Sequence, residues 1–111
     1  SEVESQVLES REGLASFVAS GLDGDETASG EAFDKNALVA AHPTYPFGTL
    51  VRIRNLENGK AVEVRIVDRG PAADSRAEGV IIDVSRAGAV APGFAEDGRS
   101  EVRVDVLRWG Q

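Results

Sequence analysis

The stretch TLVRIRNLENGKAVEVRIVD, residues 49–68, decides the fold class of this chain. Apolar and charged side chains alternate with period two on both sides of Asn58-Gly59, a pattern typical of half-buried β-strands. The Asn-Gly pair accommodates the positive φ angles that a tight hairpin turn requires. The sequence therefore predicts an antiparallel hairpin with one apolar face turned toward a core.

Further short apolar runs on both sides of this hairpin predict a small, mainly β domain. We expect strands at residues 14–18, 79–84 and 101–108. Two Ala-rich segments, 36–41 and 85–91, account for two short helices, and Ser85 can cap the second. Strands this few hide their edges best by closing into a barrel, although their spacing alone leaves a small sandwich open.

Length and composition limit the class of protein. The 111 residues fit one domain, which we place at residues 13–109, after a polar, Glu-rich linker or flexible segment at 1–12. The net charge of -7 argues against nucleic acid as a partner, and the absence of cysteine excludes a disulfide framework. No apolar stretch approaches the roughly 18 residues of a transmembrane helix.

The segment 27–31 is the first candidate for chemistry, because it places two hydroxyls and a carboxylate around a glycine. Thr27, Ser29 and Glu31 could be displayed to a ligand, or the hydroxyls could only cap a turn. His42 is the only histidine, and it could equally be structural. One histidine without cysteine or clustered carboxylates does not make a metal site, so we expect neither metal nor cofactor.

Two aspartates at the ends of predicted strands are the second candidate. Asp68 ends the hairpin beside Arg69, at a rigid position suited to a catalytic group, or it could serve only the turn. Asp83 interrupts an apolar strand, where a buried carboxylate needs a partner or a solvent-lined groove. A site role and a purely structural role stay open for both.

Seven ordered motifs give this sequence a specific resemblance. They are GLASF at 13–17, TASGE at 27–31, AAH at 40–42, PFGTLVRI at 46–53, Asn55-Leu56 with Asn58-Gly59, VRI at 64–66 with DRGP at 68–71, and IDVSRA at 82–87. Together they resemble the rare lipoprotein A family of double-psi β-barrels, of the septal-ring lytic transglycosylase type. Expansin-like barrels are related to that family.

The resemblance implies a six-stranded double-psi β-barrel with one or two short helices and a surface groove. It implies a lytic transglycosylase that cleaves peptidoglycan glycan strands, by preference peptide-free ones, and leaves anhydro-muramic ends. Carried across, the catalytic residues would be Asp68, Glu31, His42 and Asp83, with Asp68 as the acid/base. Thr27, Ser29 and Arg69 would bind substrate.

The resemblance also sets expectations about setting and partners. We expect an extracytoplasmic protein, periplasmic, outer-membrane-attached or secreted, whose signal or anchor lies outside this sequence. It would act as a monomer, with any cell-wall or division-site partners bound through regions outside this chain. Active members carry an aromatic pair after Ala-Ser in the first strand, where this chain has Phe17-Val18, and its loop 19–26 lacks their aromatic and basic residues.

Two other functions fit the same motifs. The groove of an expansin-like module binds cell-wall polysaccharide without cleaving it, and this chain could do the same. Alternatively, the motif residues could only hold the loops of a structural or partner-binding barrel together.

Overall fold

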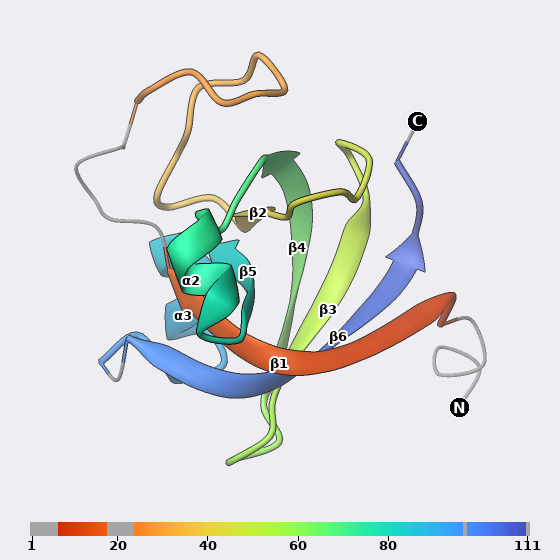
Figure 1. Ribbon diagram of the computed structural model, residues 1–111, viewed down its shortest axis with the longest axis vertical. Coiled ribbons are helices and arrows are strands. Elements are labelled where there is room, and N and C mark those ends of the chain that lie inside the picture. The colour runs from red at the N-terminus through yellow and green to blue at the C-terminus, as the bar shows by residue number, and fades with distance from the viewer. Residues whose placement is uncertain (1–6, 18–23, 97, 111) are drawn as a thin grey trace.

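The computed structural model describes residues 7–17, 24–96 and 98–110, and these form one barrel with two short helices at its side (Figure 1). The strands are β1 (Glu9–Phe17), β2 (Val39–Ala41), β3 (Leu50–Asn55), β4 (Ala61–Asp68), β5 (Val80–Val84) and β6 (Arg99–Arg108). The helices are α2 (Ala73–Ala77) and α3 (Arg86–Val90).

The six strands close on themselves in the order β1-β5-β2-β4-β3-β6. β1 runs parallel to β5 and β2 runs parallel to β4, while the other four neighbouring pairs are antiparallel. Closure leaves no strand edge free to pair with another chain. The prediction of a six-stranded barrel is confirmed.

The hairpin predicted at residues 49–68 is formed by β3 and β4. Val51 lies opposite Val64, and Ile53 lies opposite Val62. Gly59 has a φ of +76° in the connecting turn, a value that favours glycine. The alternation of apolar and charged residues therefore selects the core face as expected.

Two local predictions are corrected. Residues 39–41 form the fully buried strand β2, not part of a helix, because they pair with β4 on one side and β5 on the other. Helix α2 lies in the segment after Pro71, where no helix was expected. Helix α3 is confirmed, and its Ser85 cap accepts a hydrogen bond from the Gly88 N–H at 3.2 Å.

The first strand starts earlier than the sequence suggested. β1 begins at Glu9, so residues 9–12 of the expected linker pair with β6 as part of the barrel. Residues 1–6, Val18 and most of the loop that follows it lie outside the described residues. The limits of the domain stay a prediction.

The core fills the barrel with branched aliphatic side chains and few aromatics. Three inward-facing valines of β6, Val102, Val104 and Val106, are at most 1% exposed. Phe94 is the largest of the fully buried side chains in this core. Since such interiors pack at crystal-like density, the strands form a rigid support for side chains at their ends.

Candidate functional site

Strand β2 brings the two candidate aspartates to the same level of the barrel. Ala41 pairs with Asp68 of β4 on one side and with Asp83 of β5 on the other. His42 directly follows β2, and its N–H donates to the Asp68 carbonyl oxygen at 3.1 Å. Three residues that are far apart in the sequence therefore lie at one level of three adjacent strands.

The Asp68 carboxylate is fixed through one of its two oxygens. Its Oδ1 accepts hydrogen bonds from the N–H groups of Ala28 at 2.9 Å and Arg69 at 2.8 Å. Its Oδ2 forms no hydrogen bond with any residue that the structure describes. The half-buried side chain is thus oriented by the backbone and keeps one oxygen for a ligand.

Asp83 is held from the first strand and lies against the turn that follows Asp68. The Ser16 hydroxyl donates to its Oδ1. Gly70 has a φ of +148°, and a β-carbon there would lie 3.4 Å from the Ala41 β-carbon and 3.7 Å from Asp83 Oδ2. Both distances are ordinary van der Waals contacts, so it is the positive φ of this turn that favours glycine.

The loop with Thr27 and Ser29 supports Asp68 from outside the barrel. The Thr27 hydroxyl lies 2.9 Å from the Ser29 hydroxyl and donates to the Glu31 carbonyl oxygen at 2.9 Å. The Ser29 N–H donates to the Val67 carbonyl oxygen at 3.1 Å. Both hydroxyls thus stabilise the loop that carries Ala28 to Asp68.

Glu31 is engaged separately from the two aspartates. Both nitrogens of the Arg65 fork donate to its two carboxylate oxygens. Arg65 is exposed between the buried Val64 and Ile66, so it projects from the outer face of β4. Its hydrogen bonds lower the pKa of Glu31, against a smaller opposing effect of burial, so this carboxylate is charged at neutral pH.

His42 is a buried, neutral imidazole. Its Nδ1 accepts from the N–H groups of Thr44 and Tyr45, both at 3.1 Å, and its ring stacks on Tyr45 with centroids 3.5 Å apart. Burial, with a further contribution from the charge of Arg69, lowers the pKa of His42 to about 4. Since Nδ1 is an acceptor, the proton of the neutral ring is on Nε2.

Arg69 holds the segment that carries His42. Its guanidinium donates to the carbonyl oxygens of His42 at 3.2 Å and Tyr45 at 2.7 Å, and it lies 4.1 Å from the ring centroid of Phe47. The residue expected to bind substrate is therefore used here to position the loop between β2 and β3.

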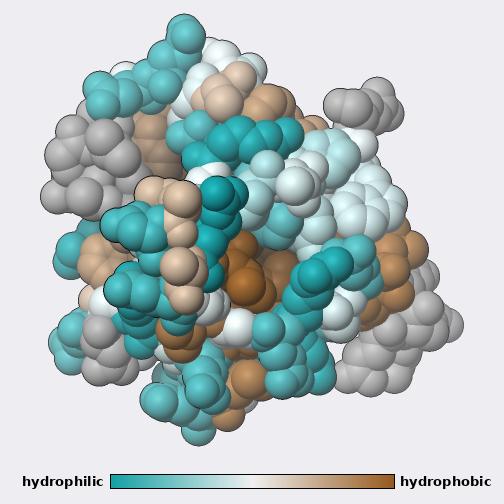
Figure 2. Space-filling view, in the orientation of Figure 1, coloured by the Kyte–Doolittle hydropathy of each residue, from teal (hydrophilic) through white to brown (hydrophobic). Residues whose placement is uncertain are grey.

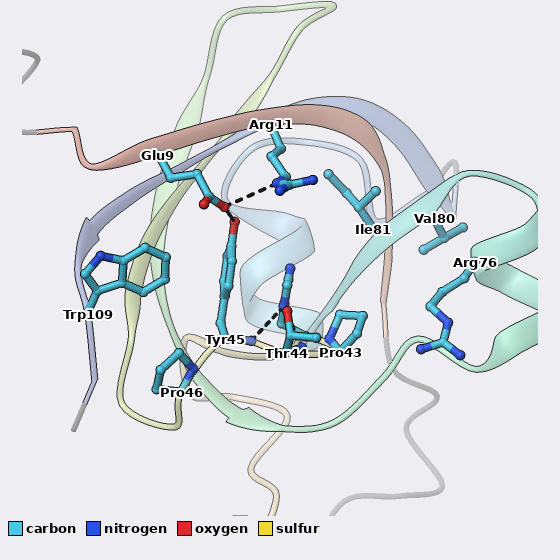
Figure 3. Close-up of a pocket in the computed structure, with 11 residues that line it drawn as sticks. Glu9, Arg11, Pro43, Thr44, Tyr45, Pro46, Arg76, Val80, Ile81 and Trp109 are labelled. Atoms are coloured by element: carbon cyan, nitrogen blue, oxygen red, sulfur yellow. Dashed lines mark hydrogen bonds and ion pairs between the residues drawn. The ribbon is translucent and has the colours of Figure 1, made fainter.

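A cleft of about 510 Å³ opens beside His42. Its walls come from β1, β5, α2, the loop after β2 and the C-terminal end of β6 (Figure 3). In Figure 2 the hollow shows as a hydrophobic patch between α2 and β1, framed by hydrophilic side chains. The residues that line it are Glu9, Arg11, His42, Pro43, Thr44, Tyr45, Pro46, Arg76, Val80, Ile81 and Trp109.

Of the residues that line this cleft, the sequence predicted only His42 as a site residue; Glu9, Tyr45, Arg76 and Trp109 are among those it missed. The Tyr45 hydroxyl donates to the Glu9 carboxylate, and this bond is the main reason that the pKa of Glu9 is lowered. Trp109 is the only tryptophan and is 41% exposed, which is the one signal that could have drawn attention to it.

The sequence profile of the lytic transglycolase family matches residues 11–104, which include His42, Asp68 and Asp83. This chain belongs to that family. It is 53% identical over 93 residues, 84% of the chain, to the probable endolytic peptidoglycan transglycosylase RlpA of Treponema pallidum. It is 38% identical over 104 residues, 94% of the chain, to the endolytic peptidoglycan transglycosylase RlpA of Campylobacter jejuni.

The chain spans only part of these relatives, 28% of the Treponema protein and 36% of the Campylobacter protein. For this domain, the family match and the identities to the two RlpA proteins confirm the resemblance to the rare lipoprotein A family.

Solved structures agree on the double-psi β-barrel fold. A Streptomyces papain inhibitor matches with a TM-score of 0.71 at 20% identity, over 92% of this chain and 97% of the inhibitor. An expansin of Clavibacter michiganensis matches with a TM-score of 0.69 at 18% identity, over 93% of this chain and 52% of the expansin. At these identities the likeness concerns the fold.

Residues 7–17, 24–96 and 98–110 contain no group of three or more His, Cys, Asp or Glu side chains arranged to hold a metal ion. None of their helices has the length and apolar character needed to cross a bilayer.

Proposed function

We propose that this chain is the catalytic domain of a lytic transglycosylase that cleaves glycan strands of peptidoglycan outside the cytoplasm. The observation that carries the proposal is that Asp68, Asp83 and His42 lie at one level of three adjacent strands, and that His42 also lines a cleft of about 510 Å³. Two further findings support the proposal: the chain belongs to the lytic transglycolase family, and its relatives are named peptidoglycan transglycosylases.

In the proposed reaction Asp68 acts twice. Its protonated carboxyl gives a proton to the glycosidic oxygen, the bond from that oxygen to the muramic anomeric carbon breaks, and N-acetylglucosamine leaves with the proton. The carboxylate then takes the proton of a hydroxyl on the same muramic residue, whose oxygen closes an anhydro ring on the anomeric carbon. The proton lost in the first step is regained in the second, and no water is consumed.

The neighbouring groups serve this acid/base. The N–H groups of Ala28 and Arg69 fix Oδ1, so that Oδ2 is the oxygen that exchanges the proton. Asp83, on the far side of Ala41, stabilises positive charge that develops on the sugar ring. His42 is neutral, so it donates a hydrogen bond from Nε2 and does not act as the acid.

The product distinguishes this reaction from ordinary hydrolysis, which two carboxylates can also catalyse. Digestion of peptide-free glycan strands should give fragments with anhydro-muramic ends in mass spectrometry. Fragments that carry an added water at a reducing end would contradict the transglycosylase proposal.

The test of Asp68 is Asp68→Asn, which keeps the shape but cannot transfer the proton. We expect turnover to fall by about 10²- to 10⁴-fold, the range typical of a lost general acid or base. Asp74→Asn, on the exposed face of α2, is the matched control and should keep full turnover. Unchanged turnover in folded Asp68→Asn would remove Asp68 from the reaction.

A second candidate is a glycan-binding module without catalysis. A point mutant of the Clavibacter expansin, of which the match covers 51%, has been solved in a complex with cellohexaose, and this complex is the reason to test binding without cleavage. If the unmodified chain binds purified sacculi but releases no fragments, and Asp68→Asn binds equally well, this second function replaces the first.

A further inference from the structure

Two aromatic side chains, Tyr45 and Trp109, line the cleft beside His42. Trp109 meets Tyr45 in an edge-to-face contact, with ring centroids 5.3 Å apart and an interplanar angle of 81°. Tyr45 is itself stacked on His42 and buried, whereas Trp109 is 41% exposed. An indole that is fixed along one edge and open to the cleft is suited to stacking against a sugar ring.

The cleft is also positively charged within an acidic protein. The chain carries a net charge of -7, yet the cleft holds two guanidinium groups, Arg11 and Arg76, and one carboxylate, Glu9. That carboxylate already accepts from Tyr45 and from Arg11, the latter at 3.2 Å. Arg76 forms no ion pair with any residue in the described part of the chain. Within these residues no carboxylate forms an ion pair that neutralises its charge.

Trp109 and Arg76 stand at opposite ends of the cleft, with Tyr45 and Thr44 between them (Figure 3). The volume of about 510 Å³ lies within the range of about 300 to 1,000 Å³ that small-molecule sites occupy. A ligand that reaches both ends can stack one face of a ring against Trp109 and place an anionic group beside Arg76.

We propose that this cleft is a subsite for an acidic oligosaccharide, in which Trp109 stacks on a sugar ring and Arg76 binds a carboxylate. The inference rests on the proposed function, because a muramic residue of a peptide-free glycan carries such a carboxylate on its lactyl group. The residues that line the cleft include His42 but neither aspartate, and the His42 N–H donates to the Asp68 carbonyl oxygen, so His42 connects the cleft to Asp68.

Two matched ligands test the proposal by calorimetric titration of the 111-residue chain. One is a peptide-free N-acetylglucosamine–N-acetylmuramic acid tetrasaccharide with free lactyl carboxylates, and the other is the same tetrasaccharide with these groups converted to carboxamides. To keep the ligands intact, the titrations use the Asp68→Asn chain. We expect the acidic ligand to bind about tenfold more tightly, with a preference that declines as salt is added.

Two variants separate the contributions. Arg76→Gln should remove the preference for the acidic ligand and leave binding of the carboxamide unchanged. Trp109→Ala should weaken both ligands alike, by about tenfold. Arg86→Gln, an exposed arginine on the other short helix, is the control and should change neither affinity. Equal binding of the two ligands, or unchanged affinities in both cleft variants, would overturn the subsite.

The subsite and the proposed reaction can fail independently. If the unmodified chain releases anhydro-ended fragments and Trp109→Ala and Arg76→Gln keep its KM, the reaction stands and the subsite is wrong. If no fragments are released but both variants lose affinity as described, the subsite stands and the reaction is wrong.

Discussion

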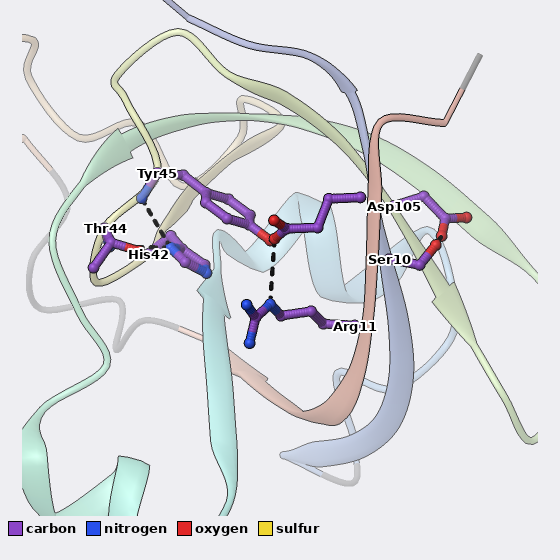
Figure 4. A network of polar contacts seen from close by, with 7 residues as sticks. Ser10, Arg11, His42, Thr44, Tyr45 and Asp105 are labelled. Atoms are coloured by element: carbon purple, nitrogen blue, oxygen red, sulfur yellow. Dashed lines mark hydrogen bonds and ion pairs between the residues drawn. The ribbon is translucent and has the colours of Figure 1, made fainter.

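Two polar networks start from adjacent residues of β1 and reach opposite faces of the barrel (Figure 4). Ser10 donates to Asp105 on the outer wall, where Arg52 donates to the same carboxylate at 3.1 Å. Glu9, on the inner face, accepts from Tyr45 at the cleft. Asp105 is 1% exposed, whereas the Glu9 side chain is 33% exposed and that of its partner Arg11 is 67% exposed.

Because the two networks differ in exposure, they contribute differently to the stability of the fold. Burial alone would raise the pKa of Asp105, but the hydrogen bonds from Ser10 and Arg52 and the charges of Arg103 and Arg52 lower it on balance. The outer network is therefore a charged cluster that the fold must keep complete. The inner network, open to water, can exchange partners with a ligand at small cost to the fold.

The largest expected effect comes from breaking the outer network. Asp105→Ala leaves the guanidinium of Arg52, whose side chain is 10% exposed, without its charge partner. We expect the free energy of unfolding to fall by about 3 to 5 kcal/mol, the usual result of removing one member of a buried pair. Urea unfolding near neutral pH measures it. Glu9→Gln on the inner face is the comparison, and an equal loss there would refute this difference between the two networks.

The next effect is a pH dependence that arises at the cleft. Because folding lowers the pKa of His42 from 6.5 to about 4, the unfolded chain binds this proton first as pH falls. The contribution of His42 is complete above pH 6.5 and is lost as pH decreases toward 4. We expect a loss of about 2 to 3 kcal/mol between about pH 7 and pH 4.5, measured by urea unfolding.

His42→Gln should remove this part of the pH dependence, because it leaves no imidazole to titrate. A variant profile as steep as the original between these pH values would show that other groups cause it.

A smaller effect is expected from the hydroxyl that joins Tyr45 to Glu9. Tyr45→Phe keeps the ring stacked on His42 but removes the donor to the carboxylate. A hydrogen bond to a charged group contributes about 1.5 to 3 kcal/mol when buried, and partial exposure of Glu9 places our expectation near the lower limit. A double-mutant cycle with Glu9→Gln isolates the pair, and a coupling energy of zero would contradict this account.

The smallest effect is expected for Arg11→Gln. The ion pair between Arg11 and Glu9 is exposed, so the unfolding free energy should change by less than about 1 kcal/mol, and less still at high salt. Thermal unfolding at two salt concentrations is sufficient. A loss of unfolding free energy as large as that of Asp105→Ala would show that Arg11 stabilises the fold as much as the buried pair does.

The sequence predicts local elements of the fold well where side chains alternate over several residues. Residues 49–68 do so around Asn58-Gly59, and the hairpin forms where expected. β2 gives no such signal, because it is three residues long and buried throughout, and its Ala residues also suit a helix. Its strand conformation is imposed by β4 and β5, partners that only the closed barrel supplies.

Some residues of the candidate site could likewise be predicted from the sequence, and others could not. Asp68, Asp83 and His42 follow from their motifs, and the barrel brings them to one level of adjacent strands. The engagement of Glu31 by Arg65, and the cleft between Glu9, Tyr45 and Trp109, depend on pairings between distant segments. No spacing within the sequence encodes those contacts, since each joins residues more than thirty positions apart.

The pairing of β1 with β6 places Ser10 opposite Asp105 and Glu9 opposite Val106. Sliding β1 by one position in one of the two directions would exchange its inner and outer faces and bring the Glu9 carboxylate opposite Asp105. Such misalignment would set two like charges together and remove the serine donor at once. The polar residues of β1 thus stabilise the native register relative to this slipped alignment.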